Sequence, residues 1–309
     1  MADERASGGL PSVAQARMAE IRKSGTWGSA LSTDEFAAIR STGFEPVGQV
    51  LGAAVYNIGY TGGYGCPGGW ASGGWLGGPV VASTQVSGQG GWGSYGALTR
   101  AMYEARYKAI DRMTAECAAL GGHGVVGVSL SFGSFPLGGL EFRAIGTAVR
   151  GTGAPAPPRP FSSDLSGQDF AKLIRAGWVP AGLALGISIA SRHDDWVTTG
   201  QRAWGAGNTE VSGYTELVHA ARHDAREQLR SDVARQGADG VVIATNSLRI
   251  RERECPSQEG RKDHIAEATV IGTAIARFTS SHQAAPPGSL AILSLDPQRR
   301  QAARVRLGR

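Results

Sequence analysis

The sequence predicts an α+β protein made of two tandem β-α-β-β modules, each with one helix packed on an antiparallel sheet. Three observations predict this fold class: an internal repeat, an apolar stripe on one helix of each copy, and strands rich in Val, Leu and Ile with spaced glycines. An internal repeat indicates one structural unit that recurs along the chain. A helix that covers one face of an antiparallel sheet is a common way to bury such a unit.

The repeat consists of three pairs of segments that occur in the same order. The pairs are residues 31–59 with 165–193, 103–128 with 219–244, and 144–150 with 270–277. The first pair is identical at nine positions, including Gly52 and Gly186, and the second shares a Gly-Val-Val triplet. Because the order is preserved and only the connections differ in length, duplication of one module explains the pattern.

Each copy has the same expected elements. A short amphipathic segment precedes a strand, a helix follows, and two further strands complete the unit. The helices end at Gly121 and Gly237, since glycine tolerates the left-handed conformation that terminates a helix. The expected strands are residues 46–56, 125–132 and 141–149 in the first copy and 179–190, 241–250 and 266–275 in the second; the short segments are 34–40 and 168–175.

Composition shifts divide the chain into five parts. These are an N-terminal extension (1–26), module 1 (27–150) with a Gly/Trp-rich insertion (60–97), a Pro-rich linker (151–160), module 2 (161–278) and a basic flexible tail (279–309). The linker composition is typical of a semi-rigid spacer.

Composition also limits the functional class. The formal net charge is +5 and lies mostly in the tail, so the folded part has no strong electrostatic reason to bind nucleic acid. Cys66, Cys117 and Cys255 are far apart and odd in number, which argues against a disulfide framework, and no CxxC pair suggests a zinc site. The first residues lack the apolar core of a signal peptide, and no run of about 18 apolar residues occurs. We therefore expect a cytoplasmic protein.

Several of these segments resemble the YbjQ-like family. The resemblance lies in residues 48–59, 119–128 and 144–150 of the first copy and in 237–244 and 270–277 of the second. It implies two diverged tandem copies of a dodecin/YbjQ-like β-α-β-β fold. It also implies homo-oligomeric rings, typically of five single modules; a tandem chain would form a ring or a pseudo-ring. The family carries a heavy-metal-binding label without a firm ligand motif.

Two histidines form the candidate metal site. His219 and His223 are four residues apart on the second helix, which places both imidazoles on one face. Asp224 and His193 are candidates to complete a site for a divalent transition metal. The alternative is a packing surface, because the copy-1 equivalents are Tyr103 and Tyr107, which are poor ligands and are candidate interface residues.

No residue pattern identifies a catalytic site. The sequence lacks a Ser/His/Asp order, HExxH, a P-loop and a dinucleotide fingerprint. His123 lies between glycines where the second copy has Asp239, which is typical of turn chemistry. An enzyme would need a site assembled at subunit contacts.

Tryptophans mark the most distinctive part of the chain. They lie in the insertion and in its shorter counterpart in the second copy: Trp70, Trp75, Trp92, Trp196 and Trp204. Three interpretations remain open, since the insertion can cover its own module, pack between subunits, or bind a ligand, glycan or lipid surface.

The tail carries five arginines: Arg299, Arg300, Arg304, Arg306 and Arg309. It is either a solvated tail, a docking peptide for a protein partner, or a contact for RNA or an anionic surface. Taken together, these features favour a non-enzymatic, self-associating binding or scaffold protein. The alternatives are metal binding through His219 and His223, and an enzyme with an assembled site.

Overall fold

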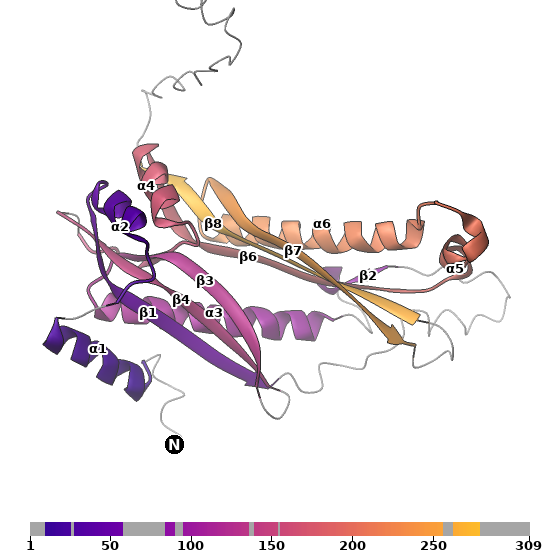
Figure 1. Ribbon diagram of the computed structural model, residues 1–309, viewed down its shortest axis with the longest axis horizontal. Helices are drawn as coiled ribbons and strands as arrows, with labels where there is room; N and C mark the ends of the chain where they lie inside the picture. Colours follow the sequence, from indigo (N-terminus) through magenta and orange to yellow (C-terminus); the bar gives the residue numbers. More distant parts are fainter. Residues whose placement is uncertain are drawn as a thin grey trace, which may run out of the picture. The chain divides into compact units, whose positions relative to one another are not determined.

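The computed structural model describes residues 10–25, 28–57, 84–89, 95–135, 139–153, 155–255 and 262–278 (Figure 1). Module 1 and the extension before it contain α1 (Ser12–Ser24), α2 (Thr33–Arg40), β1 (Phe44–Asn57), β2 (Gln85–Val86), the 3-10 turn η2 (Ser87–Gln89), α3 (Gly96–Ala119), β3 (Gly124–Phe135) and β4 (Gly139–Gly151). The second half contains β5 (Phe161–Ser162), α4 (Gly167–Arg175), β6 (Trp178–His193), α5 (Trp196–Arg202), the 3-10 turn η4 (Trp204–Ala206), α6 (Ser212–Arg235), β7 (Gly240–Glu254) and β8 (Lys262–Arg277).

The α+β prediction is confirmed, because the same β-α-β-β order occurs twice. β1, α3, β3 and β4 form one unit, and β6, α6, β7 and β8 form the other. The strand orders are β1-β4-β3-β5 in the first sheet and β2-β6-β8-β7 in the second. Each sheet also includes a short strand from outside its own β-α-β-β unit: β5 pairs with β3, and β2 pairs with β6. None of the helices in the described part of the chain is long and apolar enough to cross a membrane.

One long helix packs along each sheet (Figure 1). α3 lies on β1 and β4, and α6 lies on β6 and β8. The buried faces of these helices carry alanines at helical spacing, such as Ala105 and Ala109 on α3 and Ala221 and Ala225 on α6. Small side chains at these positions let the helix backbone approach the sheet closely.

Gly52 and Gly186 occupy the point of closest approach. A Cβ atom added at Gly52 would lie 1.9 Å from the carbonyl oxygen of Ala109, and one at Gly186 would lie 2.0 Å from that of Ala225. Only glycine leaves room for the helix backbone at this distance. The two glycines that are identical in the repeat therefore explain how the helix sits on the sheet.

α2 and α4 are neighbours, and Glu35 joins them. Ser32 and Glu35 form a capping box at the start of α2: Ser32 N–H donates to Glu35 at 2.8 Å, and Glu35 N–H donates to Ser32 Oγ at 3.2 Å. The other carboxylate oxygen of Glu35 accepts a hydrogen bond from Gly167 N–H at 3.1 Å. The Ser32 N–H is the main reason that the pKa of Glu35 is lowered.

Helix α1 was not among the expected elements, since residues 1–26 were expected only as an extension. It packs against α3, with Met18 fully buried. Arg17 forms an ion pair with the buried carboxylate of Glu116. The sequence does not predict this helix, because its apolar residues form no clear stripe and Met18 is the one residue of α1 that is buried.

The close helix-to-sheet contact gives a first prediction. Gly186→Ala should lower the free energy of unfolding by about 1–3 kcal/mol, because the added methyl group collides with backbone rather than with a flexible side chain. Gly133→Ala is the matched control, since a Cβ at that strand position meets no atom within 4 Å. Urea unfolding of both variants is the measurement. Equal effects at the two sites would contradict the packing account.

The capping box gives a prediction on pH. The folded-state pKa of Glu35 is depressed, so its stabilisation is present above the unfolded pKa of about 4.5 and is lost as pH falls through the folded value. Glu35→Gln should cost about 1 kcal/mol near neutral pH, because the amide nitrogen cannot accept from Gly167 N–H. The deficit should shrink in acid. Asp34→Asn is the control, because Asp34 has its carboxylate in the same helical turn. Urea unfolding is the measurement, and a loss of unfolding free energy in Glu35→Gln that does not change with pH would refute this assignment.

Candidate functional site

The candidate site lies in an extension of the second sheet that the first sheet lacks. In the first sheet the β3–β4 ladder ends at Phe135 and Gly139. The equivalent pair in the second sheet is Arg251 with Ile265, and that ladder continues to Glu254 with Lys262. β6 is lengthened with it, since it pairs with β8 as far as His193. The repeat thus acts as an internal reference that marks this end of module 2 as an addition.

One face of this extension carries a row of polar side chains across three strands. His193 on β6 pairs with Asp263 on β8, which in turn pairs with Arg253 on β7. His193 Nδ1 lies 2.8 Å from one carboxylate oxygen of Asp263, and Arg253 donates to the other oxygen at 3.1 Å. Asp263 is fully buried and His193 is 3% exposed. Directly opposed residues on neighbouring strands share a face, which explains why this row forms.

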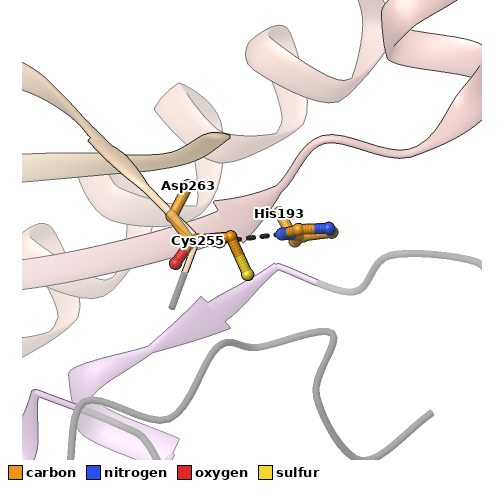
Figure 2. Close-up of side chains that lie close together, drawn as sticks. All are labelled: His193, Cys255 and Asp263. Carbon is orange, nitrogen blue, oxygen red and sulfur yellow. Dashed lines mark hydrogen bonds and ion pairs between the residues drawn. The ribbon is translucent and has the colours of Figure 1, made fainter. Parts of the chain in front are cut away.

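Cys255 completes the cluster just beyond the end of β7. Its side chain is buried, and Figure 2 shows the thiol beside the Asp263 carboxylate, with one ring nitrogen of His193 facing them. One donor atom from each of His193, Cys255 and Asp263 lies within 4.8 Å of the others. Among the described residues this is the one group of three or more His, Cys, Asp or Glu side chains that meet so closely.

The opposite face of the extension carries a second polar network. His264 Nε2 on β8 lies 3.0 Å from Asp194 Oδ1. The Asp194 carboxylate also accepts a hydrogen bond from Tyr214 on α6 at 3.1 Å and one from Arg202 on α5 at 2.8 Å. Burial and the neighbouring Asp194 raise the pKa of Tyr214. Asp195 then caps α5 by accepting from Thr198 N–H at 2.7 Å. This network fixes β6, α5 and α6 around the extension.

An imidazole, a thiol and a carboxylate form a mixed N, S and O donor set. Such a set suits zinc and other borderline transition metals rather than magnesium or calcium, which prefer oxygen ligands alone. The ion pair between Asp263 and Arg253 also gives the cluster a structural role, because a fully buried carboxylate needs hydrogen-bond partners. The second network supports the site by holding the strand that carries His193.

The two helix histidines lie elsewhere. His219 and His223 are exposed on α6, and they do not come together with His193. Asp224 is half-buried and lies against η2, where its carboxylate would be 2.4 Å from a Cβ added at Gly88. Of the four candidate ligands, the structure places only His193 in a three-donor group.

Tyr103 and Tyr107 lie where module 1 meets the second unit. Tyr103 Oη accepts a hydrogen bond from Ile187 N–H of β6 at 2.7 Å, and Tyr107 Oη donates to Asp232 of α6 at 2.6 Å. Burial raises the pKa of Tyr103 to about 12. Both tyrosines therefore hold the two units together within the chain.

The remaining candidates are the tryptophans and the arginines of the tail. Trp196 begins α5 and is 66% exposed, and Trp204 in η4 is fully exposed. Trp70, Trp75, Trp92 and the five tail arginines lie outside the described residues.

A small cavity also lies between the two sheets. Its volume is about 120 Å³, and both modules line it, with Arg106, Phe142, Arg249 and Glu267 among the contributors. The Arg106 guanidinium lies 5.1 Å from the Phe142 ring centre, and the residue is 6% exposed. A cation stacked on an aromatic ring in this way packs the junction between the modules.

Cys255 and Asp263 could not be recognised as ligand candidates from the sequence. They occur in no recognisable motif, and His193 is far from both in sequence. The extra length of the second hairpin was visible from the spacing between the Gly-Val-Val triplet and the last strand. It was the one available signal that this end of module 2 differs.

The fold and a match to a protein-family model together define the class of protein. Residues 84–152 match the YbjQ_1 family model, which carries the description "Putative heavy-metal-binding". This range includes α3, β3 and β4 of the first unit. The chain is also 34% identical over 287 residues to the encapsulin nanocompartment protein Rv1762c of Mycobacterium tuberculosis, covering 91% of this chain and 96% of that protein. The chain belongs to the family of that mycobacterial protein.

The matched segment itself is a poor fit to a metal. Cys117 donates its thiol hydrogen to Gly124 O at 3.3 Å, and burial raises the pKa of this thiol to about 12. His123 Nδ1 accepts a hydrogen bond from Gly151 N–H at 3.2 Å. Among the described residues of 84–152, no three ligand-type side chains gather. The donor set that does gather lies in the second sheet.

Proposed function

We propose that this chain is a self-associating protein that forms or joins a protein nanocompartment. The observation that carries the proposal is the 34% identity over 91% of the chain to a protein named for that role. Within the described residues, the edge strand β7 adds physical support, because Val242 and Ile243 near its start are 38% and 49% exposed. Unpaired strand edges with apolar side chains favour association with another chain.

Assembly explains the architecture better than catalysis does. Apolar side chains remain exposed at the start of the edge strand β7, at Val242 and Ile243. A scaffold protein uses such a surface to add copies.

Native mass tests this proposal. Sedimentation velocity of the purified full chain should show species well above the 32.1 kDa of one chain, and electron microscopy should show particles of regular size. A chain that stays monomeric over a range of micromolar concentrations would contradict the proposal.

We also propose a second function, binding of a divalent transition metal by His193, Cys255 and Asp263. The observation that favours it is the meeting of three different donor types within 4.8 Å in a buried extension. These residues would supply nitrogen, sulfur and oxygen ligands, and Tyr214 with Asp194 would hold the neighbouring strands in place. Binding would require Asp263 to turn from His193 towards the metal, so the hydrogen bond between them is given up.

Metal titration tests this second proposal. The wild-type chain should bind about one zinc ion by calorimetry, and cobalt should give a thiolate charge-transfer band. Both signals should be lost in Cys255→Ser and strongly weakened in His193→Ala. The double variant His219→Ala/His223→Ala is the matched control and should bind as the wild type does. Retention of both signals in Cys255→Ser would refute this site, and their loss in the control would move the site to α6.

A further inference from the structure

The junction between the two modules is built by strand addition. Residues leading into module 2 lie along the start of β3: Ser163 N–H donates to Val125 O, and Val128 N–H donates to Ser163 O, both at 2.9 Å. β5 pairs with β3 in parallel just before this point. Module 2 thus covers the free edge of the first sheet with its own entry segment.

An apolar cluster seals this junction. Its buried members come from both sides: Ile39, Val126 and Val149 from module 1, and Leu165 and Phe170 from module 2. Four of the five are fully buried, and Leu165 is 7% exposed. The junction is therefore as well packed as the core of either sheet.

The start of module 1 has the same local structure as the start of module 2. Ser29 Oγ lies 3.1 Å from Thr147 Oγ1, just as Ser163 Oγ lies 3.0 Å from Thr273 Oγ1. Ser32 caps α2 as Ser166 caps α4. In the repeat alignment Ser29 corresponds to Ser163. The entry segment of module 1 is thus preformed on its own sheet.

The other half of a second junction is also present, on β7. Val242 corresponds to Val126, yet it is 38% exposed where Val126 is fully buried. Ile275 and Leu173 correspond to the buried Val149 and Ile39, and both are only half-buried. On the donor side, Leu31 and Phe36 correspond to Leu165 and Phe170 and are half-buried too, with Leu31 packed at the margin of the internal cluster.

We infer that a second copy of this chain docks head to tail, with its residues 28–32 added along the start of β7. This inference rests on the proposed self-association and names its interface. By analogy with the internal junction, Ser29 N–H would donate to Val241 O and Ala244 N–H would donate to Ser29 O. Such an interface joins two different surfaces, so repeated docking closes a ring or extends a filament.

One hydrogen bond of the internal junction does not carry over. Gly127 N–H donates to Leu165 O at 3.0 Å, and Gly127 has a positive φ of 66°. Ile243 stands at the equivalent position, where a branched side chain disfavours that conformation. The second junction would therefore depend on two backbone hydrogen bonds and on apolar contact, without the third hydrogen bond that Gly127 gives the internal junction.

The helix contact at the second junction is occupied by α1. Asp232 accepts from Leu185 N–H and from Tyr107 of the preceding module. Its equivalent, Glu116, accepts from Leu51 N–H, and Arg17 of α1 takes the place that Tyr107 has at Asp232. In a docked pair, His223 of one copy would reach this place on the next, so α1 competes with the incoming α6.

Complementary variants test the inference. Val242→Asp should abolish docking on β7, and Leu31→Asp should abolish donation by the entry segment, so each variant alone should be monomeric. A mixture of the two retains one intact junction and should give dimers that grow no further. Ile250→Asp is the matched control, because Ile250 is also exposed on β7 but lies outside the proposed contact. Circular dichroism and thermal unfolding establish that each variant is folded.

The outcomes separate the two proposals. A monomeric wild type refutes self-association itself. An assembled wild type whose mass is unchanged by Val242→Asp refutes this interface and leaves self-association standing. Folded variants that stay monomeric when mixed would indicate a symmetric contact and overturn the head-to-tail arrangement. Met18→Asp, which removes the buried anchor of α1, should tighten association at least several-fold; weaker association would overturn the competition by α1.

Discussion

Covering a free sheet edge is the constraint on which the structure depends. Three strands and one helix leave backbone donors and acceptors exposed along the outer strand, and a module of this size buries little surface alone. In the first sheet the problem is solved within the chain, since the segment around Ser163 hydrogen-bonds to Val125 and Val128. The same contact fixes how α2 and α4 meet, through Glu35 and Gly167. In the second sheet the equivalent outer strand is β7, and no strand among the described residues pairs with its free edge.

Much of the fold could be predicted from the sequence, because residues that the packing of helix on sheet requires are identical in the two copies of the repeat. The pairing of Gly52 with Gly186 predicted matched strands, and both glycines admit a helix backbone at close range. Helix α1 could not be predicted, because one buried methionine and one ion pair hold it against the rest of the protein. Strand β5, which pairs with the sheet of the other module, could not be predicted either, because two residues are too few to show the alternation of a strand. These elements depend on contacts between distant segments, which local patterns do not encode.

The candidate site was predicted less well for a similar reason. His193 was identified beside the helix histidines, whereas its partners in the structure are Cys255 and Asp263. Cross-strand register brings His193 to Asp263, and register is set by the whole ladder rather than by a motif. The sequence shows that His219 and His223 stand in the second copy where the first copy has Tyr103 and Tyr107. The role of the two histidines depends on which surface this face of the helix contacts. Tyr107 meets Asp232 inside the chain, so in the proposed assembly the equivalent His223 would meet Glu116 of a second copy.

The two proposed sites use opposite ends of one strand. The start of β7, at Gly240–Ala244, is the surface for a second copy, and Cys255 lies just beyond its other end, so assembly leaves the metal cluster uncovered by this contact. Hydrogen exchange at the Ala244 amide tests the central claim most directly. This amide should be protected in the assembled wild type and should exchange fast in Val242→Asp. Equal exchange in the assembled wild type and in that variant would contradict it.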